Sequence, residues 1–275
     1  MLNIIANGAS IPALGFGTFR MSGAEVAAVL PAALAQGFRH VDTAQIYENE
    51  DAVGAGIAAS GVARDEIFLT TKVWVTNLAA DRFAASVEES LARLGTDHVD
   101  LLLLHWPGGS DVPREVQIDE LNRVQARGLA RHIGVSNYSV AQMNEAARLS
   151  DAPLVTNQVE YHPYLSQAAL LDAALARGMS LTAYYSLADG KVAHDPLLQE
   201  IASAHGKTAA QVTLRWLIQQ PGVAALTKTA RIGRLPENFA IFDFDLNETE
   251  MAAIHALARP DGRLVSPEGL APNWD

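Results

Sequence analysis

The chain has 275 residues, and its 20 Lys and Arg against 31 Asp and Glu give a formal net charge of −11. This acidic balance does not suit a general nucleic-acid-binding surface. The absence of cysteine excludes disulfides, thiolate metal sites and cysteine nucleophiles. The N-terminal stretch MLNIIANGASIPALGFGT has neither a basic cluster nor a long apolar run. We therefore expect no signal peptide, no membrane anchor and a cytoplasmic protein.

Short apolar segments alternate along the chain with amphipathic ones. The segment Asn3–Ile11 predicts a β-hairpin with Asn7 and Gly8 in its turn. The predicted strands that follow are Leu14–Gly17, Phe38–Asp42, Ile67–Val73, Val99–Leu104, Ala130–Val135, Leu154–Val159, Ser180–Tyr185 and Val223–Leu226. The predicted helices are Ala24–Gln36, Asn49–Ser60, Ala79–Leu94, Val116–Arg127, Val140–Leu149, Ser166–Arg177 and Thr208–Gln220.

Alternating strands and helices imply a parallel sheet, either closed as a (β/α)8 barrel or open and doubly wound. The chain length is close to that of a complete barrel, which is typically about 250 residues. No linker or low-complexity segment interrupts the pattern. We therefore expect α/β architecture with one (β/α)8 barrel domain spanning residues 1–275, and a hairpin that closes its bottom.

Polar residues end three successive predicted strands, at Asp42, Lys72 and His105, and Tyr47 lies in the loop after the first. In a barrel these positions converge on one rim, where active sites lie. Taken singly, Asp42 or Lys72 would belong to a structural ion pair as often as to a catalytic site, and His105 would more often be structural than catalytic. Together the four residues favour a catalytic site.

Such a set is suited to proton transfer. A tyrosine titrates near ~10, and a neighbouring ammonium favours the phenolate, so Lys72 is expected to lower the pKa of Tyr47. Asp42 would balance the buried charge of Lys72, and His105 could orient a carbonyl oxygen. The hydride that completes a carbonyl reduction must come from a cofactor, since no side chain can donate one.

Six motifs carry a resemblance to a known family: HVDTAQIYENE, LTTKVW, LLLLHWP, IGVSNY, NQVEYHPYL and TKTARIGRLPENF. In order and spacing, over nearly the whole chain, they resemble the aldo-keto reductases. The C-terminal GLAPNWD and the short loops are similar to those of the bacterial 2,5-diketo-D-gluconate reductases within that family.

The resemblance implies an NADPH-dependent reductase of a small aldehyde or ketone, in which Tyr47 is the general acid. The implied catalytic residues are Asp42, Tyr47, Lys72 and His105. The implied cofactor-binding residues are Ser136, Asn137 and Gln158 at the carboxamide, Tyr184 stacked on the nicotinamide, and Leu187 in the loop that follows it. They also include Lys228, Thr229 and Arg234 at the 2′-phosphate, and Glu237 and Asn238 near the adenine. The implied substrate pocket contains Phe19, Trp74 and Trp106. The resemblance implies no metal, and many relatives are monomers, so we expect a monomer with no nucleic-acid or membrane partner.

The segment from Lys228 to Arg234 concentrates positive charge, with Arg231 included, in an otherwise acidic chain. Lys and Arg both bind phosphate, so this segment favours NADPH over NADH, although a solvated basic turn would look the same. One departure from the family is Tyr185, which stands where serine is common and leaves a hydroxyl contact to the pyrophosphate in question. The short loop after His105 and the short tail suggest an open substrate site.

Two other functions fit parts of the pattern. Some relatives of this fold, such as potassium-channel β subunits, act mainly as cofactor-binding regulators, although the complete set of four catalytic residues favours an enzyme. A metal-dependent barrel hydrolase could use Asp42, His105 and His162. Lys72 would compete with the metal there, and no His-x-His strand signal is present.

Overall fold

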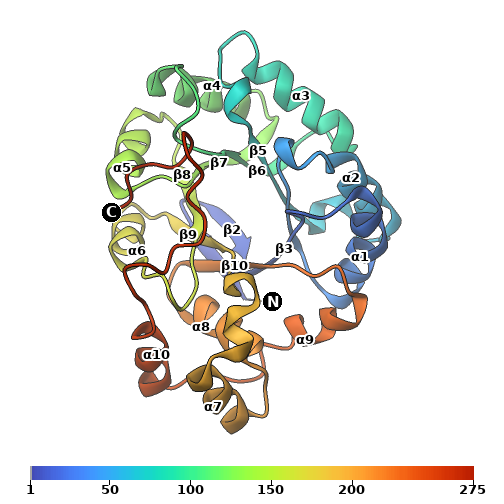
Figure 1. Ribbon diagram of the computed structural model, residues 1–275. Helices are drawn as coiled ribbons and strands as arrows, with labels where there is room; N and C mark the ends of the chain where they lie inside the picture. The colour runs from blue at the N-terminus through green and yellow to red at the C-terminus, as the bar shows by residue number, and fades with distance from the viewer. Residues whose placement is uncertain (1) are drawn as a thin grey trace.

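Eight parallel strands close into a barrel in the computed structural model, which describes residues 2–275, and β10 pairs with β3 to complete the ring (Figure 1). The barrel strands are β3 (Leu14–Gly17), β4 (His40–Asp42), β5 (Phe68–Val73), β6 (Val99–Leu104), β7 (Ala130–Ser136), β8 (Leu154–Glu160), β9 (Ser180–Tyr184) and β10 (Val223–Thr227). Neighbours in the ring follow chain order. The closed (β/α)8 barrel that the sequence predicted is thereby confirmed.

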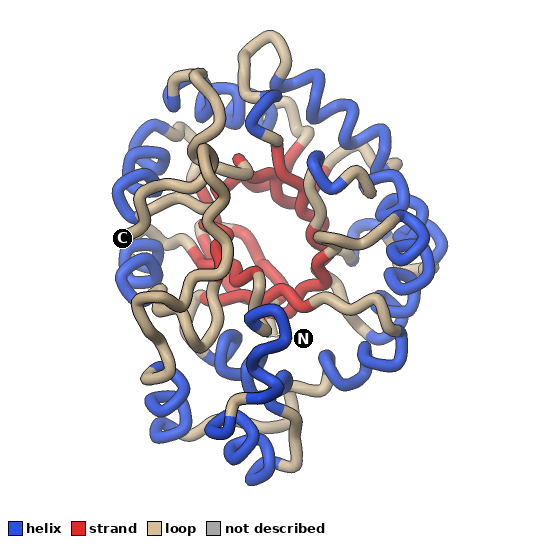
Figure 2. The backbone as a smooth tube through the Cα atoms, in the orientation of Figure 1, coloured by secondary structure: helices blue, strands red, loops and turns tan. Residues whose placement is uncertain are grey.

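Helices surround the strands on the outside of the ring (Figure 2). The α-helices are α1 (Gly23–Gln36), α2 (Glu50–Ala59), α3 (Phe83–Leu94), α4 (Arg114–Ala126), α5 (Val140–Leu149), α6 (Ala168–Leu175), α7 (Pro196–His205), α8 (Ala209–Gln219), α9 (Leu235–Phe239) and α10 (Glu248–His255). The 3-10 turns are η1 (Gln45–Tyr47), η2 (Arg64–Glu66), η3 (Val75–Asn77), η4 (Ala188–His194) and η5 (Ile232–Arg234). Because helices cover the outer face, β5 and β6 are buried at every residue.

The predicted N-terminal hairpin is also present, as β1 (Asn3–Ala6) and β2 (Ala9–Pro12). Its turn places Asn7 and Gly8 at φ 43° and 87°, which matches the primed turns that two-residue hairpins favour. The Asn7 side chain donates to the carbonyls of Leu154, at the start of β8, and Arg177, in the turn before β9. The hairpin therefore packs against the bottom of the barrel.

Most element boundaries agree with the sequence prediction to within two residues, and the differences have local causes. The strand expected from Phe38 begins at His40, because the Phe38 amide donates back to Ala33 to end α1 at Gly37. The strand expected to reach Tyr185 ends at Tyr184, because Tyr185 takes a left-handed φ of 55°. The helix expected from Ala79 begins only at Phe83.

The sequence prediction missed the short helix α9 and two longer helices, α7 and α10. Helix α7 starts at a Pro in its first turn, after Asp195, whose side chain caps it. Helix α10 begins with a capping box between Asn247 and Glu250. Within residues 2–275, no helix is both long enough and apolar enough to cross a membrane.

Candidate active site

The ends of β4 and β5 bring Asp42 and Lys72 into direct contact at the carboxyl end of the barrel, here called the mouth. The Lys72 side chain is completely buried, and its Nζ lies 2.6 Å from Asp42 Oδ1. Nζ also donates to the carbonyl of Thr43 at 2.8 Å and lies 3.5 Å from the Tyr47 hydroxyl. Three oxygens thus receive the three ammonium hydrogens, and the phenol is the longest of these contacts.

The rings of Tyr47, Trp74 and Trp106 surround His105. Its ring lies edge to face with that of Tyr47, at a centroid distance of 5.7 Å, and with that of Trp74, at 5.2 Å. Trp106 stacks against it at 6.4 Å. The imidazole is buried, and its Nδ1 has no hydrogen-bond partner among the described residues. The four residues singled out at strand ends and in the first loop therefore form one cluster.

Burial controls the protonation of this cluster. It raises the pKa of Tyr47 well above that of a free tyrosine, and the carboxylate of Asp42 raises it further. Burial lowers the pKa of Lys72, with Asp42 opposing the shift. The pKa of His105 falls well below its usual value, first through burial and then through the charge of Lys72. At neutral pH the site therefore holds a phenol and a neutral imidazole.

The expectation that Lys72 lowers the resting pKa of Tyr47 is wrong for this structure. The ammonium is closest to Asp42 and the Thr43 carbonyl, and it reaches the phenol only at 3.5 Å. The cost of burying a phenolate outweighs the remaining attraction.

Two hydrogen-bonded groups of side chains lie in the mouth beside this cluster, and Ser136 Oγ joins them by donating to the Gln158 carbonyl. Gln158 Nε2 donates to Asp42 Oδ2 at 2.7 Å, so both carboxylate oxygens have partners. The Tyr184 hydroxyl donates to Asn137 Oδ1 at 2.6 Å, and Asn137 Nδ2 donates to the His105 carbonyl and to Ser136 Oγ. Four residues expected at the nicotinamide therefore lie together, and Gln158 is tied directly to Asp42.

The basic segment after β10 lies on the same rim, next to the loop after β3. Lys228, Arg231 and Arg234 are all exposed, and none has a carboxylate within salt-bridge distance among residues 2–275. Lys228 Nζ donates to the carbonyl of Arg20 at 3.3 Å. These cations are therefore available to a ligand anion.

Tyr185 connects two loops of the mouth. Arg20 Nη1 donates to the Tyr185 hydroxyl at 2.8 Å, and the guanidinium lies over the Tyr185 and Phe19 rings, 5.9 and 5.1 Å from their centroids. The adjacent Ser186 is buried and directs its hydroxyl to the carbonyls of Ala183 and Leu226. The hydroxyl of Ser186 thus bonds backbone carbonyls, and that of Tyr185 bonds Arg20 in the loop after β3.

The remaining residues expected at the cofactor occupy the rim between β9 and α9. Leu187 precedes η4 and is half-buried. Thr229 Oγ1 accepts from the Arg231 amide, so its hydroxyl shapes the basic turn. Glu237 accepts from the Thr208 hydroxyl, and Asn238 is buried in α9.

Phe19 and the C-terminal tail border the mouth. The Phe19 ring is 41% exposed and lies 5.0 Å from that of Tyr47. The tail, dark red in Figure 1, runs along the side of the barrel that carries β8 and β9. Glu160 at the end of β8 accepts the tail amides of Leu264 and Val265, and the Gly108 amide donates to the Leu270 carbonyl. The tail therefore packs on the loop after His105, and the mouth is less open on this side than the short loop suggested.

The residues proposed for a metal site do not assemble one. Both oxygens of Asp42 accept from Lys72 and Gln158, and His162 Nε2 lies 2.9 Å from Glu160. In the part of the chain that the structure describes, no group of three or more His, Asp or Glu side chains could hold a metal ion.

Sequence reasoning missed three residues that shape the site. Thr43 offers its carbonyl to Lys72, Arg20 reaches Tyr185, and Gln45 hydrogen-bonds the loop that carries Trp74. Thr43 and Gln45 lie within the motif HVDTAQIYENE, which drew attention for other residues, and Arg20 directly follows Phe19 in the chain. Their partners, however, are distant in sequence or are backbone atoms, which no local pattern identifies.

The chain is similar to known reductases over nearly its whole length. The model of the Aldo/keto reductase family matches residues 13–259. The methylglyoxal reductase DkgB of Salmonella typhimurium is 44% identical over 268 residues, which cover 97% of this chain and 100% of that protein. The glyoxal reductase of Bacillus subtilis is 38% identical over 265 residues, with 96% and 95% covered.

Among solved structures, a crystal structure provisionally described as a 2,5-diketo-D-gluconic acid reductase B superposes with a TM-score of 0.98 at 64% identity, covering 100% of this chain and 98% of that one. The chain therefore belongs to the aldo/keto reductase family of oxidoreductases. The resemblance identified from its motifs is confirmed, including the narrower likeness to 2,5-diketo-D-gluconate reductases.

Proposed function

We propose that the protein reduces a small aldehyde or ketone to an alcohol with NADPH, and that Tyr47 supplies the proton. The observation that carries the proposal is the cluster of a protonated phenol, a buried Lys72–Asp42 pair and a neutral His105 at one end of a barrel. A nicotinamide cofactor, when bound, supplies the hydride. The side chains then have to hold the carbonyl, deliver a proton and stabilise the charge left behind.

Tyr47 and His105 face the same space, with their rings 5.7 Å apart. A neutral imidazole can donate one hydrogen bond to a carbonyl oxygen and orient it toward the phenol. As negative charge grows on that oxygen, the phenol transfers its proton, and the ammonium of Lys72 at 3.5 Å stabilises the phenolate that results. Asp42 keeps Lys72 in place throughout.

The residues of the rim suit a phosphorylated dinucleotide. Lys228, Arg231 and Arg234 carry no salt bridge within the described residues, and Arg can bind a phosphate in bidentate fashion. Asn137 and Gln158 place amide groups, and Tyr184 an aromatic ring, near His105 and Asp42. We therefore propose that the basic segment holds the 2′-phosphate and that these three residues hold the nicotinamide. Glu237 and Asn238 would border the adenine.

The relatives suggest where to look for the substrate. Two are named reductases of methylglyoxal and of glyoxal, and a structural relative is named for a diketo sugar acid. We propose a small dicarbonyl as the first candidate class. Phe19, Trp74 and Trp106 would form the walls of the substrate pocket around it. We also propose that the protein acts as a cytoplasmic monomer.

The proposal is tested by following NADPH absorbance with a panel of methylglyoxal, glyoxal, 2,5-diketo-D-gluconate and aromatic aldehydes. Tyr47→Phe should retain NADPH binding and lose about 10²–10⁴-fold in turnover, the usual contribution of general acid catalysis. Tyr161→Phe is the matched control, because its hydroxyl bonds only Gln220. Near-wild-type turnover by Tyr47→Phe would contradict the mechanism. NADPH binding without turnover on any carbonyl would instead favour a regulatory protein.

A further inference from the structure

Gln45 occupies an unusual place, buried two residues before Tyr47 in the short turn η1. A single 3-10 turn has little intrinsic stability, so its conformation must be set by its surroundings. The turn has no side-chain cap at its start, and Glu48 ends it in a left-handed conformation with φ 54°. The position of Tyr47 therefore depends on what holds η1 against the barrel.

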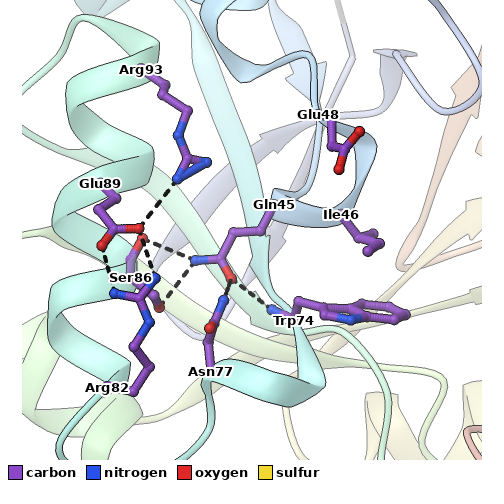
Figure 3. Close-up of a pocket in the computed structure, with 9 residues that line it drawn as sticks. All are labelled: Gln45, Ile46, Glu48, Trp74, Asn77, Arg82, Ser86, Glu89 and Arg93. Atoms are coloured by element: carbon purple, nitrogen blue, oxygen red, sulfur yellow. Dashed lines mark hydrogen bonds and ion pairs between the residues drawn. The ribbon is translucent and has the colours of Figure 1, made fainter.

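The Gln45 amide supplies that attachment (Figure 3). Its Oε1 accepts from the Trp74 backbone amide at 2.8 Å and from Asn77 Nδ2 at 2.9 Å. Its Nε2 lies 3.1 Å from the Ser86 carbonyl, 3.2 Å from Ser86 Oγ and 3.2 Å from Ser90 Oγ. Both lone pairs and both hydrogens of the amide are thus engaged.

These bonds connect three elements that are far apart in sequence. Gln45 belongs to η1, Trp74 and Asn77 to the loop after β5, and Ser86 and Ser90 to α3. Trp74 and Tyr47 both pack their rings against His105, at 5.2 and 5.7 Å. One amide therefore fixes the backbone beneath two of the three side chains that meet at the carbonyl-binding space.

We infer that Gln45 is a positioning residue for the reduction: through its buried amide it sets the placement of Tyr47 and Trp74 relative to His105, without touching the reacting atoms. This inference rests on the proposed function. Misplacing a catalytic group by about 1 Å can cost roughly 10²-fold in rate. Loss of the amide should therefore appear in kcat, with cofactor binding preserved, because none of the bonds of Gln45 reaches the proposed cofactor residues.

The test compares Gln45→Met, which keeps the length of the side chain and removes the amide, with Gln220→Met. Gln220 is also a buried glutamine, 6% exposed against 9% for Gln45, and it bonds Tyr161 and Trp216 away from the mouth. We expect Gln45→Met to lower kcat by about 10–10²-fold. Its NADPH dissociation constant should stay within about twofold of wild type, and Gln220→Met should keep both quantities within about twofold.

Two further variants keep the inference falsifiable if Gln45→Met folds poorly. Ser90→Ala removes one acceptor of Nε2 and should lower kcat by a smaller factor, with the fold intact. In Gln45→Glu, protonation restores the acceptor oxygen and one of the amide's two donors. Burial favours that protonated form, so its kcat, relative to wild type at each pH, should rise as the pH falls. A merely structural role would not produce this pH-dependent recovery.

The inference is overturned if Gln45→Met and Ser90→Ala keep wild-type kcat. It is also overturned if the loss of kcat in Gln45→Met is no larger than the fraction of unfolded protein explains, which is the test that Gln220→Met also undergoes. A flat ratio of Gln45→Glu to wild-type kcat across pH would overturn it as well. Failure of the proposed function looks different: the wild type would not turn over, or Tyr47→Phe would remain fully active. In either of those cases the proposed function and the role of Gln45 would both be refuted.

Discussion

Replacing Lys72 by Met tests the energetics on which the site depends. The substitution leaves a methionine of similar length in a completely buried position and removes the cation that lies 2.6 Å from Asp42. Asp42, 3% exposed, would keep Gln158 as its hydrogen-bond donor and lose its counter-charge. The Thr43 carbonyl would lose a donor at the same time.

Removing one partner of a buried ion pair typically costs about 3–5 kcal/mol, because the other charge stays buried and uncompensated. At roughly 2 °C per kcal/mol for a chain of this size, the melting temperature should fall by about 6–10 °C. The loss of stability should depend on pH. In the folded variant the buried Asp42 carboxyl would keep its proton, whereas in the unfolded chain an Asp titrates near ~3.9 and releases it. The variant should therefore approach the wild type in acid and lose stability as the pH rises toward neutrality.

The assay is urea unfolding of wild type and Lys72→Met without added cofactor, between pH 5 and pH 8. The double variant Asp42→Asn, Lys72→Met is the control, because it removes both charges and should recover about 2 kcal/mol or more of the single variant's loss. A deficit below about 1 kcal/mol at pH 8, or one that does not change with pH, would refute the idea that Lys72 neutralises a buried carboxylate.

Two predictions concern the cofactor. Arg234→Ala should weaken NADPH binding by about 10–10²-fold, the size of a lost charge-assisted hydrogen bond, and leave NADH binding within about twofold. Equal weakening of NADPH and NADH binding in a titration would show that Arg234 does not bind the 2′-phosphate. Tyr185→Phe removes the hydroxyl that accepts from Arg20 at 2.8 Å and should speed NADPH release about fivefold, the equivalent of roughly 1 kcal/mol. An unchanged release rate in stopped-flow fluorescence would mean that this bridge does not retain the cofactor.

The barrel could be predicted from sequence because its determinants are local. Each strand is a short apolar run bounded by turn residues, and the polar residue that ends it lies at the mouth wherever the barrel closes. That rule was enough to predict Asp42, Lys72 and His105, given the strand ends at 42, 73 and 104 that the structure confirms. The hairpin turn at Asn7 and Gly8 was equally local.

The parts that escaped prediction depend on contacts between distant segments. The attachment of Gln45 to Ser86 and Ser90 spans more than 40 residues, and the bond from Gln158 to Asp42 spans 116. Tyr185 could be recognised in the sequence as a departure. Its left-handed backbone and its partner Arg20, 165 residues away, could not. Two of the missed helices, α7 and α10, by contrast carried readable caps at Asp195 and Asn247.

The raised pKa of Tyr47 changes how the proposed proton transfer must work. Burial holds the pKa of the Tyr47 phenol well above its ordinary value, so in the proposed mechanism Tyr47 carries its proton at physiological pH and can act as the acid. Its proton becomes transferable only when hydride arrival turns the carbonyl oxygen into an alkoxide-like base. In the proposed mechanism, Lys72 lies 2.6 Å from Asp42 and 3.5 Å from the phenol, and it would stabilise a phenolate that forms only from the transition state onward. Stabilisation confined to the transition state raises kcat, whereas a phenol with a pKa below the working pH would rest without the proton it must give.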